Sequence, residues 1–143
     1  ARAAAGERGA EFLDQAVKRR DKVTERERLY IDATSAMLRI DPLRDRSDRT
    51  DAWRDDERKM RRTLETLVLK YPDDLEAKAM LALANMQEDR MGAELMIREV
   101  LAKQPDHPGA HHYRIHNWNY HEPQTALESC KRYGVIAPRI GHA

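Results

Sequence analysis

The sequence predicts an all-α protein in which antiparallel helix pairs stack side by side as an α-solenoid. Two observations lead to this fold class. Prolines stand at positions 72, 105 and 138, so two successive intervals are both 33 residues long. Apolar residues with helical spacing fill the stretches between these prolines. Repeats of this length build helical units that each pack on their neighbours.

The composition agrees with a helical chain whose surface carries both signs of charge. The 143 residues include 26 basic and 25 acidic side chains, a balance that favours neither a nucleic-acid partner nor an anionic membrane surface. The longest apolar stretch, Ala79 to Ala84, has six residues and is too short to span a bilayer. A lone cysteine, Cys130, cannot form an internal disulfide, which is compatible with the cytoplasm. The chain begins at Ala1 without a signal-peptide pattern, so any targeting peptide has been removed or was never included, and the compartment stays open.

Residues 1–40 predict an N-terminal helix pair that forms a degenerate repeat. A first helix over residues 11–23 is indicated by the helical spacing of Phe12, Leu13, Ala16 and Val17. Thr24 is followed three residues later by Glu27, a capping box that predicts a second helix from about Glu25 to Ile40. Residues 41–50 are rich in charged and hydroxyl side chains without a period, and they predict a linker loop.

Helical repeats are expected over residues 51–143. The spacing predicts helices over residues 51–71, 75–87, 92–103 and 109–120, with Asp73 or Asp74 capping the second and Pro123 opening a last helix. The charged run from Arg54 to Arg62 is interpreted as a solvated helix face. The expected buried side chains are Trp53, Met60, Leu64, Leu67, Val68, Tyr71, Ala77, Met80, Leu81, Ala84, Leu95, Ile97, Val100, Leu101, Ala110, Tyr113, Ala126, Leu127, Cys130 and Tyr133.

The repeats resemble the tetratricopeptide repeat family. Ala93 and Pro105 match the family's small residue and closing proline, and Ala126 and Pro138 match them in the next copy, again 12 positions apart. The period is one residue shorter than the family's usual length of about 34. The segment from residue 105 to 116 is also similar to a group of longer bacterial proteins of this kind that have no assigned function, which implies that the chain is the N-terminal part of a larger solenoid.

The resemblance implies a peptide-binding groove lined by the first helix of each pair. In residues 109–120 the groove residues are expected to be His111, His112, Ile115, Trp118 and Asn119. Aromatic and imidazole side chains suit recognition of an amphipathic segment. The predicted function is therefore a non-catalytic scaffold that binds a protein or peptide segment and needs no cofactor. Self-association of the chain is also expected, because apolar side chains of the last helix pair lack a neighbour.

Clustered histidines favour an alternative function, the binding of a divalent metal such as zinc with or without metal-dependent activity. Four of the six histidines lie within ten residues: His107, His111, His112 and His116. His112 and His116 have the i,i+4 spacing at which two imidazoles on one helix face can share an ion. His142 is the sequence's candidate for a third ligand.

Overall fold

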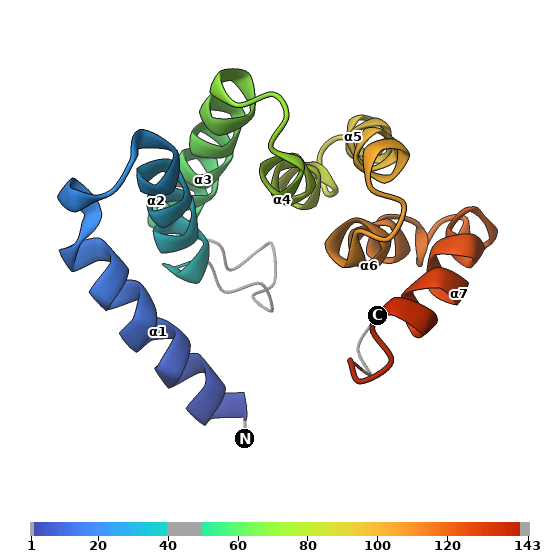
Figure 1. Cartoon of the computed structure of the whole chain (residues 1–143), viewed down its shortest axis with the longest axis horizontal. Helices are drawn as coiled ribbons and strands as arrows, with labels where there is room; N and C mark the ends of the chain where they lie inside the picture. Colours follow the sequence, from blue (N-terminus) through green and yellow to red (C-terminus); the bar gives the residue numbers. More distant parts are fainter. Residues whose placement is uncertain (1, 40–49, 141–143) are drawn as a thin grey trace. The chain divides into compact units, whose positions relative to one another are not determined.

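The structure is a computed structural model that describes residues 2–39 and 50–140 of the chain (Figure 1). Within these residues every regular element is a helix and none is a strand, which confirms the all-α class. The α-helices are α1 (Arg2–Lys18), α2 (Glu25–Arg39), α3 (Asp51–Lys70), α4 (Leu75–Asn85), α5 (Arg90–Lys103), α6 (Pro108–Trp118) and α7 (Leu127–Ile136). The short 3₁₀ helices η1 (Arg20–Lys22) and η3 (Pro123–Ala126) precede α2 and α7. Apart from Thr50, the predicted linker lies outside the described residues.

The chain divides into two compact units, residues 1–71 and 72–143. In the first unit, α2 packs against both α1 and α3. The capping box forms as predicted: the Glu27 N–H donates to Thr24 Oγ1 at 3.3 Å, and the Thr24 N–H donates to Glu27 Oε2 at 2.9 Å. The buried apolar side chains of this unit are Ala33, Ala36, Trp53, Met60, Leu64 and Leu67.

The first helix differs from its prediction at both ends. α1 begins at Arg2, because the alanine-rich start of the chain favours a helix before the first large apolar residue. It ends at Lys18, and in the turn that follows Arg20 donates two hydrogen bonds to Asp32 of α2, at 2.7 and 2.6 Å. On α3 the charged run is exposed at Arg54, Arg58, Lys59 and Arg62, as expected.

In the second unit each helix packs against the next, and α4 also packs against α6. Helices α4, α5 and α6 are capped by Asp74, Asp89 and His107, whose side chains accept from Ala77 N, Gly92 N and Ala110 N. The central apolar cluster consists of Ala82, Ala93, Ile97, Val100 and Ala110. Its alanines carry little side-chain bulk and so allow close helix approach.

At two places the buried residue is the one directly before the residue that was expected to be buried. Leu95 is 63% exposed and Glu94 is 1% exposed, because α6 offers hydrogen-bond donors to the Glu94 carboxylate. Cys130 is exposed and Ser129 is buried. The tighter 3₁₀ turn of η3 precedes α7 and shifts the phase of its buried face, which also leaves Leu127 exposed. No described helix is long and apolar enough to cross a membrane.

Candidate functional site

The histidine-bearing helix α6 lies at the centre of the second unit. It packs against α4, α5, η3 and α7, so most of its faces lie in interfaces (Figure 1). His107 caps α6 by accepting the Ala110 N–H at Nδ1, at 3.1 Å. Its Nε2 lies 3.3 Å from Glu76 Oε2 on α4. His107 is thus a buried cap that also joins α6 to α4.

His111 connects the turn after α5 with α7. Its Nε2 lies 2.8 Å from the Pro105 carbonyl oxygen, and its Nδ1 lies 3.1 Å from Ser129 Oγ. A carbonyl only accepts, so Nε2 carries the ring proton and Nδ1 accepts from the Ser129 hydroxyl. Ser129 is almost fully buried, so no substrate can reach its oxygen. This serine–histidine pair is therefore suited to holding helices together and not to nucleophilic catalysis.

His112 and His116 lie side by side on the next face of α6. Their Nε2 atoms are 2.9 Å apart, and their ring centroids are 4.7 Å apart. Nδ1 of His112 lies 3.1 Å from the hydroxyl oxygen of Tyr133 on α7. If Tyr133 donates to Nδ1, then His112 Nε2–H donates to His116 Nε2, which gives one consistent direction for the series of hydrogen bonds.

The separation of these two nitrogens is close to the roughly 3.3 Å that two imidazole ligands adopt on a tetrahedral zinc ion. A stable site needs at least one further protein ligand. Among the described residues no three His, Cys, Asp or Glu side chains are grouped so that they could hold a metal. His142 lies outside those residues, so metal binding at His112 and His116 stays a prediction.

The carboxylate of Glu94 on α5 is the most heavily bonded group near α6. Its Oε1 accepts from Arg114 Nη2 at 2.8 Å and from Arg98 Nε at 2.7 Å. Its Oε2 accepts from the indole N–H of Trp118 at 2.8 Å. Burial is the largest single influence on the pKa of Glu94 and raises it, but the hydrogen bonds from Arg114, Trp118 and Arg98 together hold that pKa below its usual value.

Sequence reasoning missed Glu94 because it assigned the next residue, Leu95, to the buried face of this helix. A signal was nevertheless present. Glu94 and Arg98 are spaced i,i+4 on one helix, and Arg114 and Trp118 have the same spacing on the next. Two such pairs on consecutive helices can meet face to face and satisfy a buried carboxylate.

The expected groove residues are not gathered on one open surface. His111, Ile115 and Trp118 are buried, His112 is half-buried, and Asn119 is exposed. Trp118, which was expected to face a groove, is buried: its indole N–H bonds to Glu94, and the Arg90 guanidinium lies over its ring, 5.9 Å from the ring centroid. Of the expected core aromatics, Trp53 is buried and Tyr113 is partly buried.

A cavity of about 540 Å³ opens beside His111, between the turn after α5 and α7. Arg132 and Asp106, which both line it, form an ion pair across it. The lining residues are Pro105, Asp106, His111, Glu128, Lys131, Arg132 and Val135. Of the predicted site residues it includes His111 alone, whose ring nitrogens are both engaged in hydrogen bonds.

Exposed apolar side chains lie on α5 at Met91 and Leu95 and directly after α6 at Tyr120. We call this the α5–α6 edge and define it by Arg90, Met91, Leu95, Asn119, Tyr120 and His121. Asn117 Nδ2 donates to the Arg90 carbonyl oxygen at 3.1 Å, and the Arg90 guanidinium contacts the His121 ring, so the two helix ends are held together. Met91 and Leu95 share one face of α5, and Tyr120 is 87% exposed.

Comparisons with models of protein families, with curated proteins and with solved structures find no match to this chain. The likeness to tetratricopeptide repeats therefore rests on the residues of the chain itself.

Proposed function

We propose that this protein is a non-catalytic helical-repeat scaffold that binds a segment of a partner protein at the α5–α6 edge. One observation carries the proposal: near α6 the polar side chains are engaged with one another, while apolar ones beside them are exposed. His111 and Glu94 direct their hydrogen bonds to neighbouring helices. Met91, Leu95 and Tyr120 present most of their surface to solvent.

Recurring helix ends support the repeat character of this scaffold. Helices α3, α5 and α7 end in C-caps at Tyr71, Gln104 and Ala137, which stand 33 residues apart. Each cap donates its N–H to the carbonyl oxygen four residues earlier, at 2.8, 2.8 and 2.9 Å. The side-chain N-caps of α4 and α6, Asp74 and His107, are also 33 residues apart. Local geometry that recurs with the sequence period favours a tetratricopeptide-like unit.

The chemistry of the edge indicates what kind of segment it binds. Methionine, leucine and tyrosine side chains provide adaptable and aromatic contact area of the kind that anchors peptides. Arg90 and His121 contact each other at the same edge and favour a carboxylate on the partner. We therefore infer that the partner segment carries large apolar side chains next to an aspartate or glutamate.

Peptide selection followed by mutagenesis tests this proposal. Peptides selected from a random displayed library against the full chain are measured for affinity by fluorescence anisotropy. We expect Leu95→Ala and Tyr120→Ala each to weaken binding by about tenfold or more, the usual effect of removing an anchor side chain. Val135→Ala on α7, equally exposed and apolar, is the matched control and should change affinity by less than about twofold. Failure to select any binder, or equal loss in the control, would contradict the proposal.

The histidine pair favours a second candidate function, the binding of a divalent metal. The supporting observation is the 2.9 Å separation of the Nε2 atoms of His112 and His116. A metal there would be held by two imidazoles and would need further ligands. The zinc content of the original chain and of the His112→Ala and His116→Ala variants decides this candidate.

A further inference from the structure

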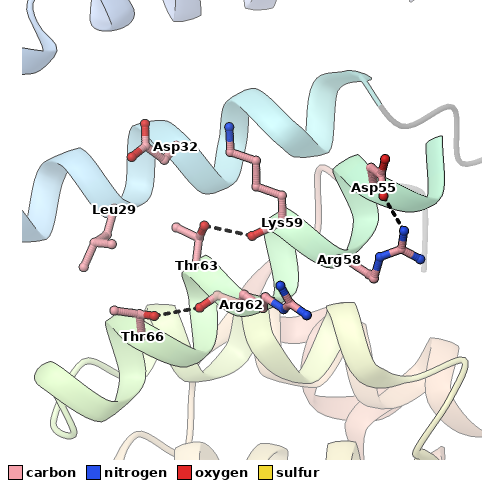
Figure 2. A pocket seen from close by; sticks show the side chains of 8 residues that line it. All are labelled: Leu29, Asp32, Asp55, Arg58, Lys59, Arg62, Thr63 and Thr66. Carbon is pink, nitrogen blue, oxygen red and sulfur yellow. Dashed lines mark hydrogen bonds and ion pairs between the residues drawn. The ribbon is translucent and has the colours of Figure 1, made fainter. Parts of the chain in front are cut away.

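A cleft in the first unit has no part in the proposed function. It lies between α2 and α3, has a volume of about 330 Å³ and is shown in Figure 2. Leu29 and Asp32 of α2 form one side. The other side comes from α3 and consists of Asp55, Arg58, Lys59, Arg62, Thr63 and Thr66.

Both acidic residues of the cleft already have an arginine partner. Asp32 accepts hydrogen bonds from Arg20 Nε at 2.7 Å and Nη2 at 2.6 Å, so both its oxygens are engaged. Asp55 is paired with Arg58. No carboxylate among the described residues lies within ion-pair distance of Lys59 or Arg62. The cleft therefore holds two cations without an ion-pair partner, although the charge of Asp32 still acts on Lys59 at longer range.

The arrangement of these cations differs from that of a uniformly solvated helix face. In Figure 2 the Lys59 side chain extends from α3 toward α2, while Arg58 and Arg62, one helical turn apart, lie together at the other end of the cleft. Thr63 and Thr66 donate their hydroxyl protons to the Lys59 and Arg62 carbonyl oxygens, both at 2.8 Å. Their oxygens can only accept further hydrogen bonds, so an anion in the cleft would be bound by the cations.

We propose that the cleft between α2 and α3 binds a phosphate-type oxyanion through Lys59 and Arg62. A phosphate carries close to two negative charges near neutral pH and so matches two unpaired cations better than a carboxylate does. The planar guanidinium of Arg62 can donate two parallel hydrogen bonds to it. Lys59 stands i,i+3 from Arg62 on α3, so its flexible side chain can turn from α2 toward the same anion and add a point charge. The volume leaves room for more than the anion, so both free phosphate and a phosphoryl group on a small molecule fit this chemistry.

Titration of the full chain with inorganic phosphate tests the site. Backbone amide resonances are followed by NMR while sodium chloride keeps the ionic strength constant. We expect saturable shifts confined to α2 and α3 around the cleft. Arg62→Ala and Lys59→Ala should each weaken binding by about tenfold, because each removes charged hydrogen bonds to the anion. Phosphoserine, with serine as its uncharged counterpart, forms a second arm, and tighter binding than phosphate would identify a phosphoryl group on a larger molecule.

Arg54→Ala is the matched control, because it removes an exposed arginine from the same helix outside the cleft. It should leave the phosphate affinity within about twofold of the original. Linear shifts that do not saturate, or equal weakening by Arg54→Ala and Arg62→Ala, would overturn the site and show general attraction to a basic helix. This outcome is independent of peptide binding at the α5–α6 edge, which involves other residues in the other unit.

Discussion

A single buried carboxylate, that of Glu94, links α5 to α6. Removing a charge from water is costly unless hydrogen bonds replace the lost hydration, and here Arg98, Arg114 and Trp118 supply them. Arg114 and Trp118 come from α6, so the same bonds fix how the two helices meet. At the residue scale, the polar groups near the candidate site therefore act mainly by holding helices in place.

The lowered pKa of Glu94 predicts a specific loss of stability in acid. Because its pKa in the folded protein lies below the usual glutamate value, its stabilising contribution is complete above that value and is lost as pH falls through the folded pKa. Urea denaturation at a series of pH values should show this loss from about pH 5 downward. Glu94→Gln cannot ionise and should show a shallower fall. If the stability of the two proteins falls in parallel with pH, Glu94 is not stabilised in its ionised form by its hydrogen bonds.

Zinc content tests the histidine pair. Two imidazoles alone bind zinc weakly, and among the described residues no third ligand joins them, so we expect well under one zinc ion per chain by elemental analysis of the purified protein. Reloading with zinc and repeating the measurement on His112→Ala and His116→Ala separates this pair from the other histidines, with the exposed His121→Ala as control. The second candidate function would be established if the original chain and the His121→Ala control each bind one zinc ion per chain and both His112→Ala and His116→Ala lose it.

At the scale of helices, local signals in the sequence predicted where elements begin and end. The start of α2 followed from Thr24 and Glu27, and the start of α4 from Asp74. Local signals predicted most of the residues that turn inward, but not all of them. Glu94 took the place expected for Leu95, because that choice depended on donors from a helix that packs beside it.

The candidate site shows the same division. The gathering of histidines on one helix was predictable from spacing alone. Spacing did not predict which of these histidines are buried. The burial of His111 depends on its contact with Ser129 in α7, and the rotation of α7 depends on the 3₁₀ turn before it. The sequence pattern likewise did not show that Tyr120 and Met91 are exposed, so the predicted contact residues included the buried Trp118 instead.

A matched pair of leucines on α3 tests the assignment of its buried face. Leu67 is fully buried, and Leu69, two residues on, is 82% exposed. Leu67→Ala should lower the free energy of unfolding by about 2–5 kcal/mol, the range for emptying a buried leucine site. Leu69→Ala should change it by less than about 0.5 kcal/mol. Chemical denaturation measures both, and similar costs for the two variants would mean that α3 is rotated relative to this description.

At the scale of the whole molecule, the chain combines two compact units, each with its own core. The phosphate-type cleft belongs to the first unit and the α5–α6 edge to the second. The two proposed binding activities can therefore be removed separately by mutation. In a variant that has lost one binding activity, the other activity shows whether the protein is still folded.

Exposed apolar residues on α7 predict self-association of the chain. Leu127 and Val135 both present more than half of their surface to solvent. Sedimentation at increasing protein concentration should show a rise in average mass, and Leu127→Glu should reduce it. Leu69→Glu, on α3, places the same charge at an exposed leucine elsewhere and should leave the association unchanged. A monomer at the highest soluble concentration would exclude this behaviour.

The central claim, that a partner segment binds at the α5–α6 edge, is tested most directly by NMR mapping of a selected peptide. We expect amide shifts to concentrate at residues 90–95 and 119–121. Resonances of the buried His111 and Trp118 should keep their hydrogen-bonded positions. Shifts spread over the whole second unit, or concentrated at His112 and His116 instead of at the edge, would contradict the account.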